Sequence, residues 1–213
     1  MTIRFLAAAA LLATLSSPAL AQADAPAAAS QPAAPAAARP ELVPVAIETS
    51  LGRIVVALDK TDAPVTTANF LRYVDAHRFD GEAFYRAMRV GSGGLIQGGI
   101  SSDARKLYPP IAHEPTTKTG LHDVAGAIAM ANAGAGTARA DFFILASDMP
   151  SLDATADQPG FAVFGHVIEG MDVVQKILAA PVSETKGEGV MKGQMLDPTI
   201  KIVRMSRLAP SKP

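Results

Sequence analysis

Apolar residues recur with a period of two in segment 53–59, where Ile54, Val56 and Leu58 fall on one face. This alternation is typical of a half-buried β-strand. A second apolar segment, 45–48, precedes it, and the short connection between the two contains a glycine. The pattern therefore predicts a β-hairpin at the start of the folded part of the chain.

A helical spacing follows. Pro64 suits the first turn of a helix, and apolar residues then recur at near-helical intervals as far as position 77. We predict a helix over residues 64–77, with Thr61 or Asp62 as its N-cap. A second helix is predicted over residues 171–178, where three apolar residues share one face.

Short strand-like runs, separated by glycine-rich turns, make up most of the rest of the chain. They cover residues 84–88, 95–99, 126–131, 142–145, 162–168 and 200–208. Many short strands with two isolated helices favour an all-β barrel over a βαβ sheet. The pattern alone leaves a β-sandwich and a closed barrel as alternatives.

Residues 1–21 have the parts of a secretory signal peptide. Arg4 gives a positive start, an apolar run follows, and small residues end at Ala21. We expect cleavage after Ala21 and a periplasmic location. The apolar run is short for a bilayer span, so no stable membrane insertion is expected, and an uncleaved anchor is the alternative.

Residues 22–41 consist largely of alanine and proline, which leaves little apolar bulk to bury and forbids a continuous helix. This composition predicts a disordered linker, with a proline-rich ligand as the alternative. Residues 42–208 have the length of one domain, and 209–213 form a short tail.

Composition and charge exclude several classes of function. Without Arg4, 19 − 1 = 18 basic side chains face 20 acidic ones, so there is no electrostatic footprint for nucleic acid or an anionic membrane. The chain has no cysteine and therefore needs no disulfide. Its four histidines show no paired spacing, so no metal and no cofactor are expected.

Four short motifs carry the residues from which a function can be inferred. They are Phe84-Tyr85-Arg86, Leu95-Ile96-Gln97-Gly98-Gly99, Ala129-Met130-Ala131-Asn132-Ala133-Gly134 and Asp141-Phe142-Phe143-Ile144. They place one guanidinium, one amide and a phenyl ring where an extended peptide could lie. No nucleophile–base pair accompanies them, so the chemistry must need none. Rotation about a proline peptide bond meets that condition.

The order of these motifs, followed by Val163-Phe164-Gly165 and Glu169-Gly170-Met171, resembles the cyclophilins, the cyclosporin-type peptidyl-prolyl isomerases. The resemblance runs from roughly Ala46 to Arg207. Each motif is short, but together, in the family's order and at near-family spacing, they make a specific signal. The resemblance implies a closed eight-stranded antiparallel barrel capped by a helix at each end.

The resemblance also implies a role for individual residues. Arg86 and Gln97 are the expected catalytic residues. The expected substrate-binding residues are Phe84, Leu95, Ala131, Asn132, Phe143, Leu152 and Phe161. Adjacent strand residues face opposite sides, so only one of Phe142 and Phe143 lines a pocket, and the resemblance selects Phe143.

The expected mechanism depends on Arg86. The rotation barrier of about 18–20 kcal/mol comes from amide resonance, in which the proline nitrogen shares its lone pair with the carbonyl. A donor aimed at that nitrogen localises the lone pair, and an arginine supplies a permanent charge and a rigid fork of donors. The alternative is an ordinary surface arginine on a strand.

Several positions depart from the best-known cyclophilins. Tyr85 stands where they have histidine, Gly94 where they have a pocket phenylalanine, and Asp141 where they have glutamine. Phe161 replaces a histidine and Ser151 a tryptophan. These losses leave two alternatives to a full isomerase: a peptide-binding chaperone or scaffold with weak turnover, and an unrelated small-ligand barrel of the lipocalin kind. The expected partners are proline-containing, unfolded or partly folded polypeptides, bound by a monomer.

Overall fold

The predicted hairpin is formed by β1 (Leu42–Thr49) and β2 (Gly52–Asp59), which pair antiparallel along their whole length. The computed structural model describes residues 39–209. The predictions for residues 1–21 and for nearly all of the linker, residues 22–38, lie outside this part of the chain.

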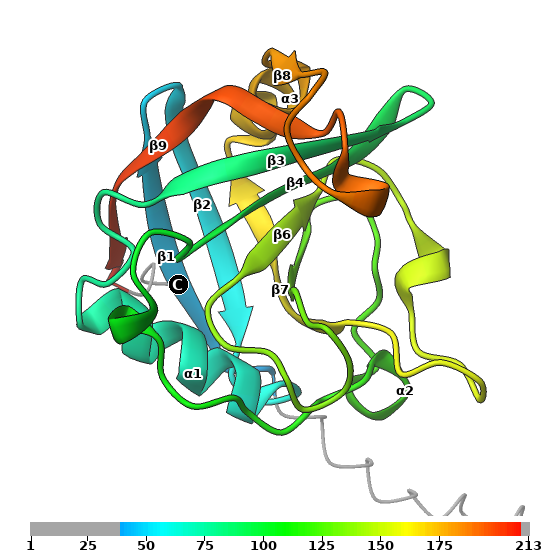
Figure 1. Cartoon of the computed structure of the whole chain (residues 1–213). Coiled ribbons are helices and arrows are strands. Elements are labelled where there is room, and N and C mark those ends of the chain that lie inside the picture. Colours follow the sequence, from blue (N-terminus) through cyan, green and yellow to red (C-terminus); the bar gives the residue numbers. More distant parts are fainter. Residues whose placement is uncertain (1–38, 210–213) are drawn as a thin grey trace, which may run out of the picture. The chain divides into compact units, whose positions relative to one another are not determined.

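The strands close into a barrel, as Figure 1 shows. The order of the barrel strands is β1-β2-β7-β5-β6-β4-β3-β9, and a pairing between β1 and β9 closes the ring. All pairings are antiparallel, and the two-residue strand β8 (Val182–Ser183) adds to β9. The predicted eight-stranded barrel is confirmed. The remaining strands are β3 (Ala83–Val90), β4 (Gly93–Gly99), β5 (Ala127–Met130), β6 (Phe142–Leu145), β7 (Ala162–Glu169) and β9 (Met195–Arg207).

Two helices cover the ends of the barrel in Figure 1, α1 (Pro64–Asp75) and α3 (Met171–Ala179). A single-turn helix, α2 (Thr116–Thr119), was not predicted, nor were three short 3₁₀ segments, Ala104–Lys106, Pro150–Leu152 and Gly189–Met191. Within residues 39–209 no helix has the length and apolar character needed to cross a membrane.

The predicted N-cap of α1 is wrong. Ala63 occupies that position and offers no side-chain acceptor. The carboxylate of Glu114 accepts hydrogen bonds from the amides of Val65 and Thr66 instead, at 3.1 and 2.8 Å. A helix start needs acceptors and favours negative charge, and here a distant loop supplies both.

The barrel interior is filled mainly by aliphatic and aromatic side chains. Ile54, Val56 and Leu58 all point into this core, as their spacing predicts. The expectation of a half-buried strand is wrong, however, because Val55 and Ala57 on the opposite face are buried too. A second apolar cluster lies on the other face of the sheet and includes Phe143, Leu95 and Leu145. This second cluster forms the floor of the candidate active site.

Candidate active site

Arg86 reaches the outer face of the barrel because of a β-bulge. The pairing of β3 with β4 shifts register between Phe84, which faces Gly98, and Arg86, which faces Gln97. Tyr85 is the extra residue. A bulge of this kind re-aims the side chains that follow it, so Phe84 and Arg86 do not share a face.

The bulge also corrects one prediction. Phe84 is fully buried in the barrel core, where its ring packs edge-on against Phe142 at 5.6 Å between centroids. Phe84 therefore has no path to a substrate, and the assignment of Phe84 as a substrate-binding residue is wrong. It supports the strand that carries Arg86.

Two glutamines hold the guanidinium of Arg86, one 11 residues and the other 108 residues away along the chain. Nη1 donates to Oε1 of Gln97 at 2.8 Å. Nε and Nη2 both donate to Oε1 of Gln194, at 2.9 and 2.7 Å. The amide of Gln194 in turn donates to the carbonyl of Val190 at 2.8 Å. Burial lowers the pKa of Arg86 from its usual value, but a guanidinium stays protonated at neutral pH.

The other side of Gln97 continues the hydrogen-bonded chain. Its Nε2 donates to the hydroxyl of Tyr85 at 2.8 Å, and that hydroxyl donates to Oδ1 of Asp141 at 2.8 Å. Burial, and then the nearby Asp141 charge, raise the pKa of Tyr85, so the phenol stays neutral and keeps its proton. Two departures from the best-known cyclophilins, Tyr85 and Asp141, are therefore bonded to each other.

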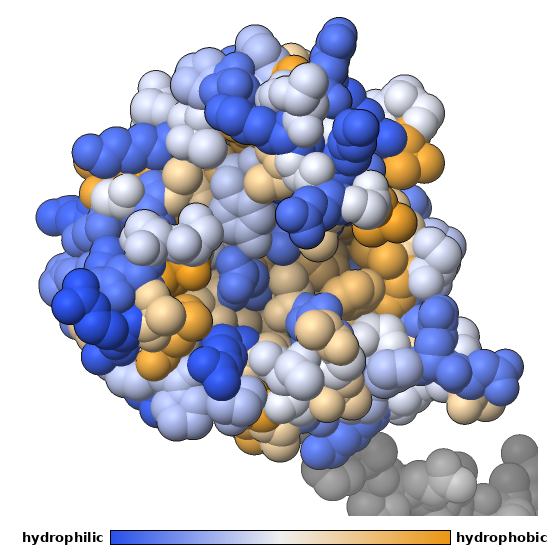
Figure 2. All heavy atoms as spheres, viewed as in Figure 1, coloured by the Kyte–Doolittle hydropathy of each residue, from blue (hydrophilic) through white to orange (hydrophobic). Residues whose placement is uncertain are grey.

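Beside Arg86 lies an apolar cavity of about 270 Å³. Figure 2 shows a hollow with apolar surface on this face of the molecule. The rings of Phe143 and Phe161 meet edge to face at 5.2 Å between centroids. Arg86 and Gln97 lie at the polar edge of this cavity, and its apolar wall consists of Met88, Leu95, Phe143, Leu152, Phe161, Val190 and Met191.

Strand alternation separates the two neighbouring phenylalanines of β6. Phe142 packs in the barrel core, whereas Phe143 belongs to the outer cluster and lines the cavity. Leu152 reaches the wall from the 3₁₀ segment Pro150–Leu152. The backbone amide of Leu152 donates to the carbonyl of Met149 at 2.9 Å. Ser151 is exposed and is not among the residues that line the cavity.

Ala131 and Asn132 form the border with a second cavity of about 280 Å³. This second cavity is lined on its far side by Arg139 and Asp141. The side-chain Nδ2 of Asn132 is buried and has no hydrogen-bond partner among the described residues. The position of the two residues between the cavities suits pairing of their backbone with an extended peptide.

Sequence reasoning missed the segment 189–194 and Met88. Gln194 is 108 residues from Arg86 along the chain, yet it makes two of the guanidinium's bonds. Val190 and Met191 of the same segment cover the cavity. No motif identified them, because the only signal was a Gly- and Lys-rich stretch typical of a surface loop.

Replacing Gln194 by leucine should lower kcat/KM for an X-Pro peptide about tenfold, mainly through kcat. The change removes two of the bonds that orient the guanidinium and leaves the charge in place. One hydrogen bond to a charged group contributes about 1.5–3 kcal/mol, part of which water can replace. Steady-state kinetics check this, with Gln175→Leu as a control outside the cavity. A wild-type kcat in Gln194→Leu would contradict a positioning role.

Gly94 cannot carry the phenylalanine of the best-known cyclophilins. Its φ of 136° lies in a region that favours glycine, and a Cβ there would be 1.9 Å from the backbone oxygen of Met88. The side chain of Met88, the partner of Leu95 across the β3–β4 pair, fills part of the wall instead. Met88 therefore lines the cavity where Gly94 has no side chain to offer.

Restoring that phenylalanine should consequently harm the protein. We expect Gly94→Phe to lower the free energy of unfolding by more than about 2 kcal/mol, from backbone strain and the clash together. Chemical denaturation measures this, and Gly120→Ala, at a positive φ but with open space around it, isolates the contribution of strain. A stable and more active Gly94→Phe would show that the wall is built differently.

A buried carboxyl group, that of Asp123, lies against the partly exposed carboxyl group of Asp153, which follows Leu152 in the chain. Asp123 is 1% exposed, and neither carboxylate oxygen has an N–H or O–H donor among the described residues. Burial, together with the charge of Asp153 and a hydrogen bond to its carboxyl group, raises the pKa of Asp123 to about 7. Asp153 also accepts from the backbone of Asp123 at 3.0 Å and contacts Nδ1 of His122 at 3.2 Å.

This raised pKa makes stability depend on pH. The folded state holds a proton on Asp123 up to about pH 7, whereas the unfolded state releases it near the ordinary value of 3.8. Stability is therefore lost as pH rises between about 4 and 7. Asp123→Asn, which cannot ionise, should have a higher Tm than the wild type at pH 8, with a gap that closes toward pH 4. Thermal unfolding at three pH values tests this, with exposed Asp157→Asn as control; a constant gap would contradict it.

Within the described part of the chain, no group of three or more Asp, Glu or His side chains is placed to hold a metal ion. Arg86 is instead held by two glutamines beside an apolar wall. The fold and this site together define a closed barrel with one fixed positive charge at the edge of an apolar cavity.

Comparison with known proteins identifies the family. Residues 44–207 match the model of the cyclophilin type peptidyl-prolyl cis-trans isomerases. A peptidyl-prolyl cis-trans isomerase A from Dickeya dadantii is 38% identical over 137 residues, which are 62% of this chain and 70% of that protein. A peptidyl-prolyl cis-trans isomerase from Streptomyces antibioticus is 37% identical over 150 residues, covering 67% of this chain and 87% of its own.

A crystal structure of a cyclophilin from Cryptosporidium parvum has the same fold, with a TM-score of 0.65 and 20% identity, covering 80% of this chain and all of that one. The chain belongs to the cyclophilin family and is a peptidyl-prolyl cis-trans isomerase. The lipocalin-like alternative is thereby excluded.

Proposed function

We propose that this isomerase acts in the periplasm and accelerates the folding of exported proteins that contain X-Pro bonds. The observation that carries the location is the N-terminal pattern of Arg4, an apolar run and small residues ending at Ala21. The absence of cysteine is compatible with an oxidising compartment. Uncatalysed proline isomerisation takes tens to hundreds of seconds, so it is slow enough to limit folding there.

The residue roles that we propose follow from the geometry of the cavity. The proline ring lies against Phe143, Leu95, Leu152 and Phe161, where burying apolar surface supplies affinity. Arg86 then donates to the proline nitrogen, which weakens the double-bond character of the peptide bond. A cyclophilin from Cryptosporidium parvum was crystallised in the presence of the dipeptide Ala-Pro, which supports a proline-containing ligand.

The substrate backbone is bound next to this cavity. We assign Ala131 and Asn132 to the pairing of the enzyme with an extended peptide, because both line the two cavities. Gln97 contacts the same peptide while it holds Arg86. All of these residues come from one chain, so the proposal needs only a monomer, and no nucleic acid takes part.

Processing of the full-length chain tests the location. Expressed in a Gram-negative cell, it should appear in the periplasmic fraction with Gln22 as its first residue, as measured by intact mass. A variant with Ala19→Glu and Ala21→Glu should remain uncut and serves as the control. Recovery of the chain in the cytoplasm with residues 1–21 intact would contradict the proposal, and an uncut chain in the membrane would favour the anchor.

The folding role is tested with a substrate whose refolding is limited by an X-Pro bond. The processed chain should accelerate the slow phase in proportion to enzyme concentration. Suppression of aggregation with no change in that phase would instead support the chaperone or scaffold alternative.

A further inference from the structure

We propose that Asp141 and Tyr85 are positioning residues that set the direction of the Gln97 amide and, through it, the orientation of the Arg86 guanidinium. The proposal rests on the role proposed for Arg86. Tyr85 and Asp141 line the neighbouring cavity, whereas Arg86 lines the proline cavity, and Gln97 lies between the two cavities. The two residues therefore act on catalysis without touching the reacting atoms.

Each hydrogen bond of this network has a fixed direction. A guanidinium can only donate, so Gln97 must turn its oxygen toward Arg86, as it does at 2.8 Å. The amide nitrogen of Gln97 then points the other way and donates to the hydroxyl oxygen of Tyr85 at 2.8 Å. The hydroxyl proton of Tyr85 therefore needs an acceptor other than Gln97.

Asp141 supplies that acceptor. An ionised carboxylate accepts and cannot donate, so the bond of 2.8 Å from Tyr85 has only one possible direction. The chain of bonds thus has a permanent donor at one end and, while Asp141 is ionised, a group that can only accept at the other. Every group between them is fixed, and a reversed Gln97 amide would bring two donors together at Arg86.

The surroundings of Asp141 are built to hold it in place. Its backbone oxygen accepts from the amide of Ala131 at 2.9 Å, which ties it to the site's peptide-binding edge. Gly99 on the adjacent strand leaves room for it, since a Cβ there would lie 2.6 Å from Oδ1 of Asp141. Gln97 itself is buried, so water cannot readily replace a lost partner.

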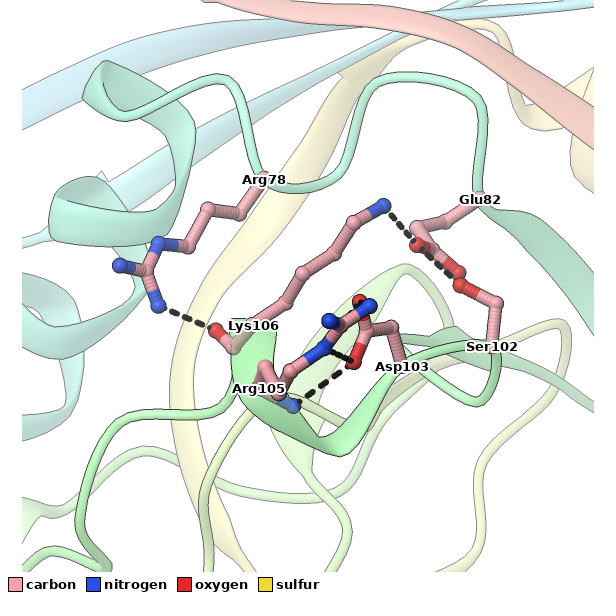
Figure 3. A network of polar contacts seen from close by, with 6 residues as sticks. All are labelled: Arg78, Glu82, Ser102, Asp103, Arg105 and Lys106. Carbon is pink, nitrogen blue, oxygen red and sulfur yellow. Dashed lines mark hydrogen bonds and ion pairs between the residues drawn. The ribbon is translucent and has the colours of Figure 1, made fainter.

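The charges around Asp141 determine how it titrates. Burial raises its pKa most, the bond from Tyr85 opposes this, and the charge of Glu82 raises it further. Figure 3 shows that Lys106 forms an ion pair with Glu82 and that Ser102 donates a hydrogen bond to it, each at 2.7 Å from Oε1. Two cations lie near Asp141. Arg139 lines the same cavity as Asp141, and Arg86 lies on the other side of Gln97.

A raised pKa predicts an acid limb in the activity. Once protonated, Asp141 can donate to Tyr85, and the phenol proton is then free to turn toward Gln97 and favour the reversed amide. The value of kcat should fall as pH drops through the pKa of Asp141 and stay level above it. No other group of the hydrogen-bonded chain titrates in the acid range, because Arg86 stays charged and Tyr85 stays neutral.

Kinetics of three variants test this inference. Asp141→Asn and Tyr85→Phe should each lower kcat for an X-Pro peptide about five- to twentyfold, with KM within twofold of the wild type. The double variant should be no slower than the slower single variant, because both residues act through one chain of bonds. The acid limb should disappear in Asp141→Asn and persist in the exposed control Asp157→Asn.

The outcomes separate this inference from the proposed function. An inactive Arg86→Ala variant together with wild-type kcat in both Asp141→Asn and Tyr85→Phe would overturn the positioning role alone. Additive losses in the double variant, or an unchanged acid limb in Asp141→Asn, would also overturn it. An active Arg86→Ala variant would overturn the role proposed for Arg86, on which this inference rests.

Discussion

Replacing Arg86 by alanine should lower kcat/KM for an X-Pro peptide by a factor of 10² to 10³. Removing one well-placed donor from a site that stabilises a developing charge typically costs this much, about 2.7–4 kcal/mol. Arg86 is placed for that role, because three of its nitrogens are held by Gln97 and Gln194 while it faces the apolar cavity. The effect should fall mainly on kcat, since the proline ring is bound by other residues.

Stability should change little in this variant. Arg86 is not part of either apolar cluster, and the space that its deleted side chain leaves admits water, which can donate to the oxygens of the two glutamines. Thermal unfolding should shift by no more than a few degrees. Arg105→Ala is the matched control, since the side chain of Arg105 is 91% exposed and pairs with Asp103 away from the cavity. Arg86→Lys should also be slow, because one ammonium cannot bond both glutamines as the planar fork does. Retention of more than half of the wild-type kcat/KM by Arg86→Ala would contradict the mechanism.

The fold was largely predictable because strand patterns are local. The period-two spacing of Ile54, Val56 and Leu58 places them in the core, and the same alternation separates Phe142 from Phe143. The alternation fails where a bulge interrupts it, which is why Phe84 was misassigned. A single extra residue moves every later side chain of the strand to the opposite face of the sheet. Nothing in the side chains at 84–86 indicates that a bulge occurs there.

The contacts that sequence reasoning missed are the non-local ones. Glu114 caps α1 from 49 residues away, and Gln194 holds Arg86 from 108 residues away. Both are ordinary polar residues in loops, and their role exists only once the barrel has closed. The bond between Tyr85 and Asp141 belongs to the same class: each appeared as a separate departure from the family, and the structure joins them in one network.

Replacing Phe143 by alanine should damage both stability and activity. The side chain is 3% exposed, packs edge to face against Phe161 at 5.2 Å, and belongs to the cluster under the cavity. Deleting a buried phenyl ring typically lowers the free energy of unfolding by about 3–5 kcal/mol, through lost transfer energy and the void that remains. Because the same ring forms the wall proposed for proline, KM for an X-Pro peptide should rise as well.

A milder pair of substitutions separates packing from function in the same strand. Phe143→Leu and Phe142→Leu each replace a phenyl ring by a smaller aliphatic side chain. Each should lower the free energy of unfolding by a similar small amount, about 1–2 kcal/mol. Only Phe143→Leu should also raise KM, since Phe142 faces the barrel core and Phe143 faces the cavity. Denaturation and steady-state kinetics at a temperature where both variants are folded measure the two effects. Equal KM values for both variants and the wild type would place the proline ring elsewhere, because a binding wall cannot lose half of its aromatic surface without weakening its ligand.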